Sequence, residues 1–143
     1  MKEVKESNSY CHKKHFEELT GQLIDQQAKD LANKVKWIEL PNSSNKDKLA
    51  YPISISGEGN PVLLIHGFDS SFLEFRRISP LISTFNKVII PDLHGFGFTP
   101  RPEAMEYGPE SIIYHLNEVI NLFGRKHPIR IIGASMGGAV AME

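Results

Sequence analysis

One serine in this sequence stands where a serine can act as a nucleophile. Ser135 lies at the centre of a Gly-x-Ser-x-Gly pentapeptide, between Gly133 and Gly137. The apolar run 129–132 precedes the pentapeptide, and helix-forming residues follow it. A strand, a sharp turn and a helix in this order expose the side chain at the turn. Because the turn is sterically tight, the flanking positions must be small, and the pattern predicts a nucleophile elbow with Ser135 at its tip.

A serine nucleophile also needs groups that stabilise the negative charge of its tetrahedral intermediate. The N–H of Met136 directly follows the serine and lies at the start of the next helix, whose dipole favours an anion. A second N–H is supplied by a loop that follows an earlier buried strand. The run 61–65 ends in His66-Gly67-Phe68. We therefore predict the backbone N–H groups of Phe68 and Met136 as the two oxyanion donors.

The elements that must position these groups alternate between strands and helices. Continuous apolar runs indicate strands buried on both faces, at 61–65, 87–93 and 129–132. Helices are expected after Ser71, which forms a capping box with Glu74, after Ser79, and from Gly108 to Gly124. For the last helix we expect a buried stripe made of Ile113, Leu116, Val119, Ile120 and Phe123.

Two further strands, at 37–40 and 49–56, are expected to form an antiparallel hairpin before these units. Pro52 favours an edge position for the second of them. The order predicts the α/β class, with a mostly parallel sheet and an antiparallel N-terminal hairpin. Ligands bind beyond the carboxyl ends of such strands, and three Gly-rich loops sit there, at 66–71, 92–102 and 133–138.

Residues 1–36 are expected to be an N-terminal extension that carries one amphipathic helix. Residues 1 to about 12 are expected to be frayed. After them, apolar side chains recur at steps of three or four, interrupted by Gly21, at Phe16, Leu19, Leu23, Leu31 and Val35. The pattern is typical of a helix that docks on the domain or on a partner. It contains no residues in a catalytic or ligand-binding pattern.

Composition excludes several classes of function. The chain has 143 residues, 41% of them hydrophobic, and a formal net charge of −1, which is typical of a soluble globular protein and unfavourable for a nucleic-acid surface. The one cysteine, Cys11, excludes an internal disulfide and has no partner spaced for zinc. We expect no cofactor and no metal. No secretory signal and no apolar run of about 20 residues is visible, so we expect a cytoplasmic protein without a membrane span.

Three motifs together resemble the α/β-hydrolase superfamily: His66-Gly67-Phe68, the loop 92–99 and the elbow 133–138. The similarity runs from about Trp37 to the end and is nearest to the branch of esterases, carbon–carbon-bond hydrolases and epoxide hydrolases. Members with an aspartate nucleophile carry it where Ser135 stands here. The resemblance implies a serine hydrolase that acts on an ester, thioester, amide or carbon–carbon bond of a small molecule.

The resemblance also implies two groups that the sequence does not supply. In the family the acid and then the histidine follow the serine. Eight residues follow Ser135, none of them histidine, and Glu143 is their only carboxylate. Residues 37–143 are therefore expected to be the N-terminal part of a hydrolase domain, truncated after the elbow and inactive alone. His66 and His94 take structural roles in the resemblance, and Asp69 and Asp92 cap loops. The other histidines are expected at the surface or at helix ends: His12, His15, His115 and His127.

A second interpretation is a non-catalytic interaction module or gene fragment, completed by a complementing C-terminal fragment or by self-association. The truncation would leave the strand 129–132 as an apolar edge, which favours pairing with another chain. A third interpretation, a phosphate-binding loop at 133–138, is disfavoured, because the glycine spacing fits neither nucleotide-binding pattern.

Overall fold

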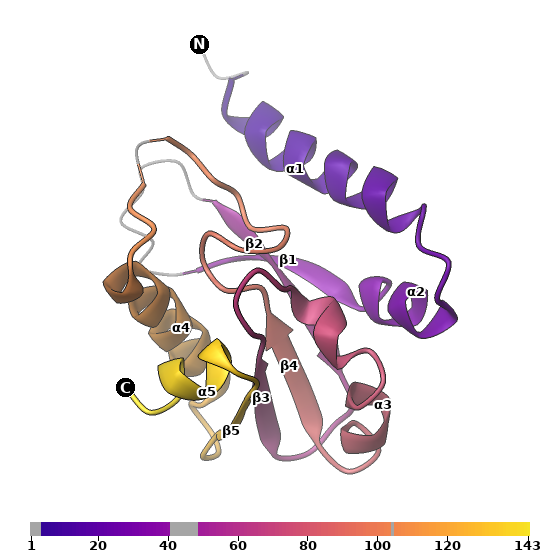
Figure 1. The fold of residues 1–143 in the computed structure, drawn as a ribbon, viewed down its shortest axis with the longest axis vertical. Helices are drawn as coiled ribbons and strands as arrows, with labels where there is room; N and C mark the ends of the chain where they lie inside the picture. Colours follow the sequence, from indigo (N-terminus) through magenta and orange to yellow (C-terminus); the bar gives the residue numbers. More distant parts are fainter. Residues whose placement is uncertain (1–3, 41–48, 104) are drawn as a thin grey trace.

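The computed structural model describes residues 4–40, 49–103 and 105–143, with side chains described from residue 12 onward. A single five-stranded sheet forms its centre, with the order β1-β2-β4-β3-β5 (Figure 1). The strands are β1 Val35–Glu39, β2 Ala50–Ser56, β3 Pro61–Ile65, β4 Lys87–Pro91 and β5 Arg130–Gly133. The helices are α1 Val4–Thr20, α2 Gln26–Ala32, the 3-10 helix η1 Phe72–Phe75, α3 Ser79–Ile82, α4 Pro109–Phe123 and α5 Met136–Val140.

The strand pairing confirms the predicted α/β class. β1 pairs with β2, and β2 with β4, in antiparallel fashion, whereas β3 pairs in parallel with both β4 and β5. The edge position predicted for β2 is wrong, because β2 has a partner on each side. Pro52 is tolerated there because it pairs only with Trp37 of β1, and the β4 ladder begins one residue later, at Ile53.

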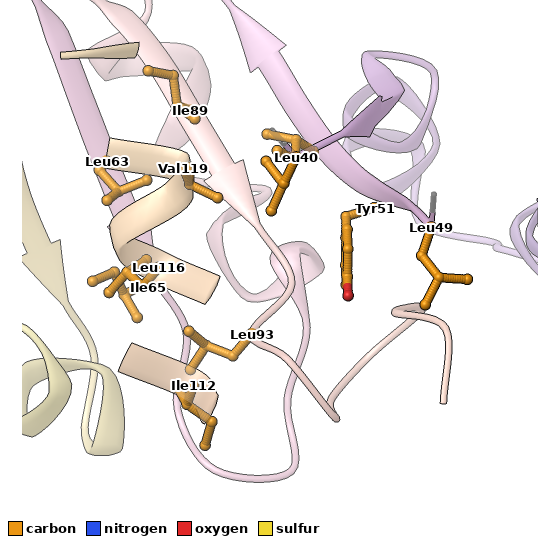
Figure 2. Close-up of a cluster of buried hydrophobic side chains, with 11 residues drawn as sticks. Leu40, Leu49, Tyr51, Leu63, Ile65, Ile89, Leu93, Ile112, Leu116 and Val119 are labelled. Atoms are coloured by element: carbon orange, nitrogen blue, oxygen red, sulfur yellow. The ribbon is translucent and has the colours of Figure 1, made fainter. Parts of the chain in front are cut away.

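The sheet is buried on both faces, as the apolar runs predicted. Alternate residues of β3 and β4 enter two separate clusters. One cluster packs the sheet against α4 and is shown in Figure 2; we call it the α4 face. The other packs the sheet against α1, α2 and η1; we call it the N-terminal face. Figure 1 places α4 and α5 on one side of the strands, and α1, α2 and α3 on the other.

The N-terminal extension contains two helices, so the expectation of one helix is wrong. α1 ends at Thr20, next to Gly21, and α2 begins at Gln26. Asp25 starts the second helix, since its carboxylate accepts the N–H groups of Gln27 and Ala28. The helical pattern read as far as Val35 also fails, because Val35 is the first residue of β1. Helical structure begins at Val4, where a frayed end was expected.

Two of the other predicted helices differ from the structure in detail. After Ser71 the chain forms only the four-residue η1, in which the Ser71 hydroxyl accepts the N–H of Leu73. α4 has the predicted bounds, between Gly108 and Gly124, but its buried stripe is different. Ile113 is only half-buried, whereas the fully buried positions include two ionisable side chains: Ile112, His115, Leu116, Glu118 and Val119. Over the described residues, no helix is long and apolar enough to cross a membrane.

Candidate active site

Ser135 occupies the turn between β5 and α5 with a backbone conformation that an L-residue rarely adopts. Its φ is 51° and its ψ is −118°. Only one other non-glycine residue among those described, Asp69, has a positive φ. Such a conformation is strained, and it persists only where the surroundings enforce it. The Ser135 side chain is exposed at this point. The predicted strand, turn and helix are all present, and the turn has the geometry of a nucleophile elbow.

Close backbone contacts explain why glycine flanks Ser135 on each side. A Cβ added at Gly137 would lie 2.2 Å from the carbonyl oxygen of Ile65. A Cβ added at Gly133 would lie 2.3 Å from the carbonyl carbon of Gly137. Real Cβ atoms essentially never come this close to backbone atoms. At Gly138 the nearest atom would be 3.5 Å away, which is ordinary contact. The two glycines of the pentapeptide are therefore required by packing, and Gly138 is not.

The loop after β3 lies directly against the elbow. A Cβ added at Gly67 would be 3.4 Å from the Cβ of Ser135, and the N–H of Ala134 donates to the carbonyl of Ile65 at 2.9 Å. The Phe68 side chain is 72% exposed. Among the described residues, neither the N–H of Phe68 nor that of Met136 has a hydrogen-bond partner. The structure thus brings the predicted nucleophile and the loop of the predicted second donor together.

His66 fixes the orientation of the peptide that carries the Phe68 N–H. The N–H of Leu93 donates to Nε2 of His66 at 2.9 Å, so Nε2 is an acceptor and the proton lies on Nδ1. Nδ1 in turn donates to the carbonyl of Gly67 at 2.8 Å. That carbonyl and the N–H of Phe68 belong to one trans peptide, so they point in opposite directions. The Phe68 N–H is therefore aimed away from the buried histidine ring.

The same geometry prevents His66 from acting as the base for Ser135. Both of its ring nitrogens are hydrogen-bonded within the protein, and the side chain is fully buried. Burial also lowers the pKa of the imidazole, although the Gly67 carbonyl opposes this shift. The structural role expected for His66 is what the structure shows.

Asp92 is buried and holds two loops in place. Its Oδ1 accepts the N–H of Phe72 at 2.6 Å, and its Oδ2 accepts the N–H of Phe98 at 2.7 Å. Burial raises the pKa of this carboxyl to about 7, and the two N–H donors oppose the shift. Gly97, with a φ of 53°, lets the chain pass so close that an added Cβ would lie 2.3 Å from Oδ2. The loop-capping role expected for Asp92 is confirmed.

Glu74 is a site contact that the sequence analysis missed. Its Oε2 accepts the N–H of Gly67 at 2.8 Å, so the carboxylate is tied to the loop beside Ser135. The capping box had assigned this side chain to the helix start at Ser71. The spacing of three residues identified the N-terminus correctly. It could not reveal that the N–H of Gly67, four residues before Ser71, competes as a donor to this carboxylate.

His115 contradicts the expectation of a surface or helix-end position, since it is 5% exposed. It packs with Tyr51 at a ring distance of 4.5 Å and with His94 at 5.7 Å, and His94 stacks on Tyr107. We call these four residues the histidine–tyrosine cluster. Among the residues that the structure describes, neither ring nitrogen of His115 has a hydrogen-bond partner, nor does Nδ1 of His94. Burial, and to a smaller extent the charge of His94, lowers the pKa of His115 to about 3.

The remaining histidines lie where the sequence placed them: His15 and His127 are exposed, and His12 is partly exposed. Within the described ranges, no group of three or more His, Cys, Asp or Glu side chains could hold a metal ion. The site therefore offers an exposed serine, two N–H groups without a partner among the described residues, and a loop at 66–68 that hydrogen bonds hold in place. That combination suits covalent attack by serine on a carbonyl carbon.

Comparison with known proteins agrees with this geometry. Residues 60–143 match a family model described as the alpha/beta hydrolase fold. The chain is 37% identical over 89 residues to a 2-hydroxy-6-oxo-2,4-heptadienoate hydrolase of Pseudomonas putida, covering 60% of this chain and 32% of that protein. It is 36% identical over 96 residues to Lipase 1 of Psychrobacter immobilis, covering 67% of this chain and 30% of the lipase.

Solved structures show the same likeness. A meta-cleavage product hydrolase of Pseudomonas fluorescens superimposes with a TM-score of 0.60 at 35% identity, covering 65% of this chain and 35% of that one. The chain thus spans about a third of the length of the relatives that it matches.

Proposed function

The chain belongs to the α/β hydrolase fold family, and from this membership we propose that it carries the nucleophile of a serine hydrolase. Ser135 attacks the carbonyl carbon of an ester, thioester or amide, or of the ketone in a carbon–carbon bond hydrolysis. The backbone N–H groups of Phe68 and Met136 stabilise the resulting oxyanion. The substrate is a small molecule, because the similar proteins are named as hydrolases and lipases.

The strained backbone at Ser135 is the observation that supports this proposal most strongly. A positive φ on a serine is unfavourable, and here three close contacts hold it: Gly133 against Gly137, Gly137 against Ile65, and Gly67 against Ser135. If this loop had no chemical role, a glycine at position 135 would adopt the same conformation without strain. The free N–H groups on either side of the serine supply a reason for keeping it.

The second part of the proposal concerns the proton of Ser135. The only histidine in the adjoining loop, His66, has both ring nitrogens hydrogen-bonded. His94 and His115 lie in the histidine–tyrosine cluster, packed on Tyr51 of β2. These 143 residues therefore contribute the nucleophile and the oxyanion hole, while the base and the acid that orients it come from another segment. The isolated chain is accordingly expected to have negligible turnover. A cytoplasmic location is part of the proposal and rests on the single cysteine.

A chimera tests the proposed nucleophile. Residues 60–143 would replace the matching segment of the Pseudomonas putida hydrolase, which keeps its own remaining segments. Hydrolysis of 2-hydroxy-6-oxo-2,4-heptadienoate and of p-nitrophenyl butyrate would be measured for the chimera and for its Ser135→Ala variant. We expect activity in the chimera and a loss of at least about a thousandfold in the variant. Equal activity in a folded Ser135→Ala variant would refute the role of Ser135.

The exposed edge of the sheet favours a second candidate, a module that another chain completes. Among the described strands, β5 pairs with β3 alone, and Ile131 and Ile132 are 37% and 44% exposed. An apolar edge strand of this kind is a template for pairing with a further strand. Sedimentation velocity at micromolar concentration tests this role. Dimers or larger species that dissociate on an Ile132→Lys substitution support it, and a monomer at every concentration argues against it.

A further inference from the structure

The helix pair α1–α2 contacts the segments that build the candidate site through two side chains. Phe16, on α1, is buried in the N-terminal face of the sheet. Asp25, the residue that caps α2, is half-buried and reaches Arg76 directly after η1. Both contacts fall on chain segments that adjoin the loop 66–68, which we call the oxyanion loop after its proposed role. Neither was expected from the sequence, which gave the extension no role in the chemistry.

The ring of Phe16 contacts Phe72 and Phe98, one from each of the two loops that Asp92 holds in place. It lies edge-on to Phe98 at 5.0 Å and tilted against Phe72 at 6.2 Å, and these two rings are 5.9 Å apart. Trp37 of β1 supports Phe16 from the sheet, edge-on at 5.8 Å. Aromatic pairs at such distances have preferred geometries, so the position of Phe16 constrains the positions of the other rings.

The backbone of the same two phenylalanines leads to the oxyanion loop. The N–H groups of Phe72 and Phe98 donate to the Asp92 carboxylate, at 2.6 and 2.7 Å. The next residue, Leu93, donates its N–H to His66 at 2.9 Å, and His66 fixes the Gly67 carbonyl. Four non-covalent contacts, and the covalent step from Asp92 to Leu93, thus connect Phe16 to the peptide that bears the Phe68 N–H. Every side chain along this route is buried or half-buried.

The ion pair gives the helix pair a second attachment. Nε of Arg76 donates to Oδ2 of Asp25 at 2.9 Å, and the guanidinium also donates to the carbonyl of Leu73 at 3.3 Å. The hydrogen bond from Arg76 lowers the pKa of the Asp25 carboxyl. Because Arg76 follows η1, this pair attaches α2 to the segment that contains Phe72 and Glu74. Glu74 itself holds the Gly67 N–H.

We propose that the helix pair α1–α2 is a positioning element for the oxyanion loop. Phe16 and Asp25 hold Phe72, Phe98 and Arg76, and through Asp92 and His66 they fix the Gly67–Phe68 peptide against Ser135. The inference rests on the proposed serine-hydrolase function, because the Phe68 N–H is an oxyanion donor only if Ser135 is the nucleophile. Phe16 and Asp25 are positioning residues that act through others, since neither touches Ser135.

Amide hydrogen exchange and 15N NMR on the 143-residue chain test the proposal. In the Phe16→Ala variant, we expect exchange of the Phe72, Phe98 and Leu93 amides to accelerate at least about tenfold more than that of Leu63 and Ile89, whose strands report global opening. The His66 ring nitrogens should also move from the signature of a single Nδ1–H tautomer toward an average of two. Phe16→Leu should restore most of both properties, because it refills the volume.

Leu19→Ala is the matched control, because Leu19 lies on the same helix and is 41% exposed. It should leave the exchange pattern and the tautomer unchanged. If Phe16→Ala does not fold, Asp25→Ala replaces it, and local acceleration is then expected at Phe72 and Arg76. Equal acceleration of every amide in these variants would show that the helix pair only adds stability, and would overturn the proposal. An unchanged His66 tautomer would overturn it as well.

These readouts separate the inference from the proposed function. Exchange and tautomer do not depend on the Ser135 hydroxyl, so the Ser135→Ala chain should give the same result. If Ser135 proves unreactive in the chimera while the exchange pattern changes as expected, the proposed chemistry fails and the mechanical connection stands. If Ser135 reacts and the pattern does not change, only the inference about the helix pair fails.

Discussion

His66 and His115 are both buried side chains, but their surroundings differ in almost every other respect. Each ring nitrogen of His66 has a backbone partner, and those partners lie on two separate loops of the candidate site. Neither ring nitrogen of His115 has a hydrogen-bond partner within the described part of the chain, and the rings of Tyr51 and His94 are its aromatic neighbours. A buried polar group with partners fixes an orientation, whereas one without partners mainly costs desolvation. Rigid hydrogen bonding is therefore concentrated around the loop 66–68 beside Ser135.

The largest effect that tests this difference is expected at the elbow itself. Gly137→Ala should destabilise the fold by more than about 4 kcal/mol, or prevent folding, because its Cβ would meet backbone atoms of β3 that cannot move away. Urea unfolding measures the free energy. Gly138→Ala is the matched control and should change stability by less than about 1 kcal/mol. Equal effects at the two glycines would mean that the contact between elbow and loop is not tight.

Leucine substitutions at the two histidines give the next largest difference. His66→Leu removes two hydrogen bonds and leaves the Leu93 N–H and the Gly67 carbonyl without partners, at an expected cost of about 3 kcal/mol. His115→Leu removes no hydrogen bond and replaces an unsatisfied ring by an apolar side chain, so it should be neutral or stabilising at pH 7.5. The reverse order of unfolding free energies would contradict the comparison.

The sequence identified the first histidine environment far better than the second. His66 follows a continuous apolar strand and precedes glycine, so its loop and its place at the carboxyl end of the sheet follow from the local pattern. His115 lies in a helix whose apolar side chains allow two neighbouring stripes, centred on Ile112 or on Ile113. The choice between them depends on where α4 meets Tyr51 and the loop at His94, and no local pattern contains that information.

The site was predictable to a similar, limited extent. Gly-x-Ser-x-Gly identified the elbow because steric crowding dictates those residue types locally. The hydrogen bond of Glu74 to Gly67 and the contact of Phe16 with Phe98 join residues 7 and 82 positions apart, and tertiary packing alone creates them. The N-terminal region divides into α1 and α2 because Asp25 caps the second helix. The apolar periodicity, which continues through Val35, predicted one helix and hid this signal.

A smaller effect concerns pH and distinguishes the same two environments. The pKa of His115 is about 3 in the folded state and about 6.5 when unfolded, so the unfolded chain binds a proton first as pH falls. Its contribution to stability is complete above pH 6.5 and is lost as pH falls from there toward 3. Between pH 6.5 and pH 5 the loss amounts to about 2 kcal/mol.

Asp92 acts in the opposite sense over a neighbouring range. Its folded pKa is raised to about 7, so between pH 7 and pH 4 the Asp92 carboxyl is protonated in the folded state and ionised in the unfolded state. Acidification in this range therefore stabilises the fold. The His115 contribution is therefore measured as a difference, from urea unfolding of the chain and of His115→Leu at each pH. Between pH 6.5 and pH 5, the free energy of unfolding should fall by about 2 kcal/mol less for His115→Leu than for the unchanged chain. His127→Leu, at an exposed position, is the control, and parallel curves for His115→Leu would exclude the buried histidine as the cause.

We propose that the elbow and the loop 66–68 position Ser135, while the base that activates it lies outside these residues. Reaction with a fluorophosphonate, followed by intact-mass and peptide analysis, tests both parts at once. We expect the chimera with the Pseudomonas putida hydrolase to be labelled at Ser135 within minutes, and the 143-residue chain to be labelled no faster than its Ser135→Ala variant. Rapid labelling of Ser135 in the isolated chain would contradict the absence of a base, and labelling of the chimera at another residue would contradict the nucleophile.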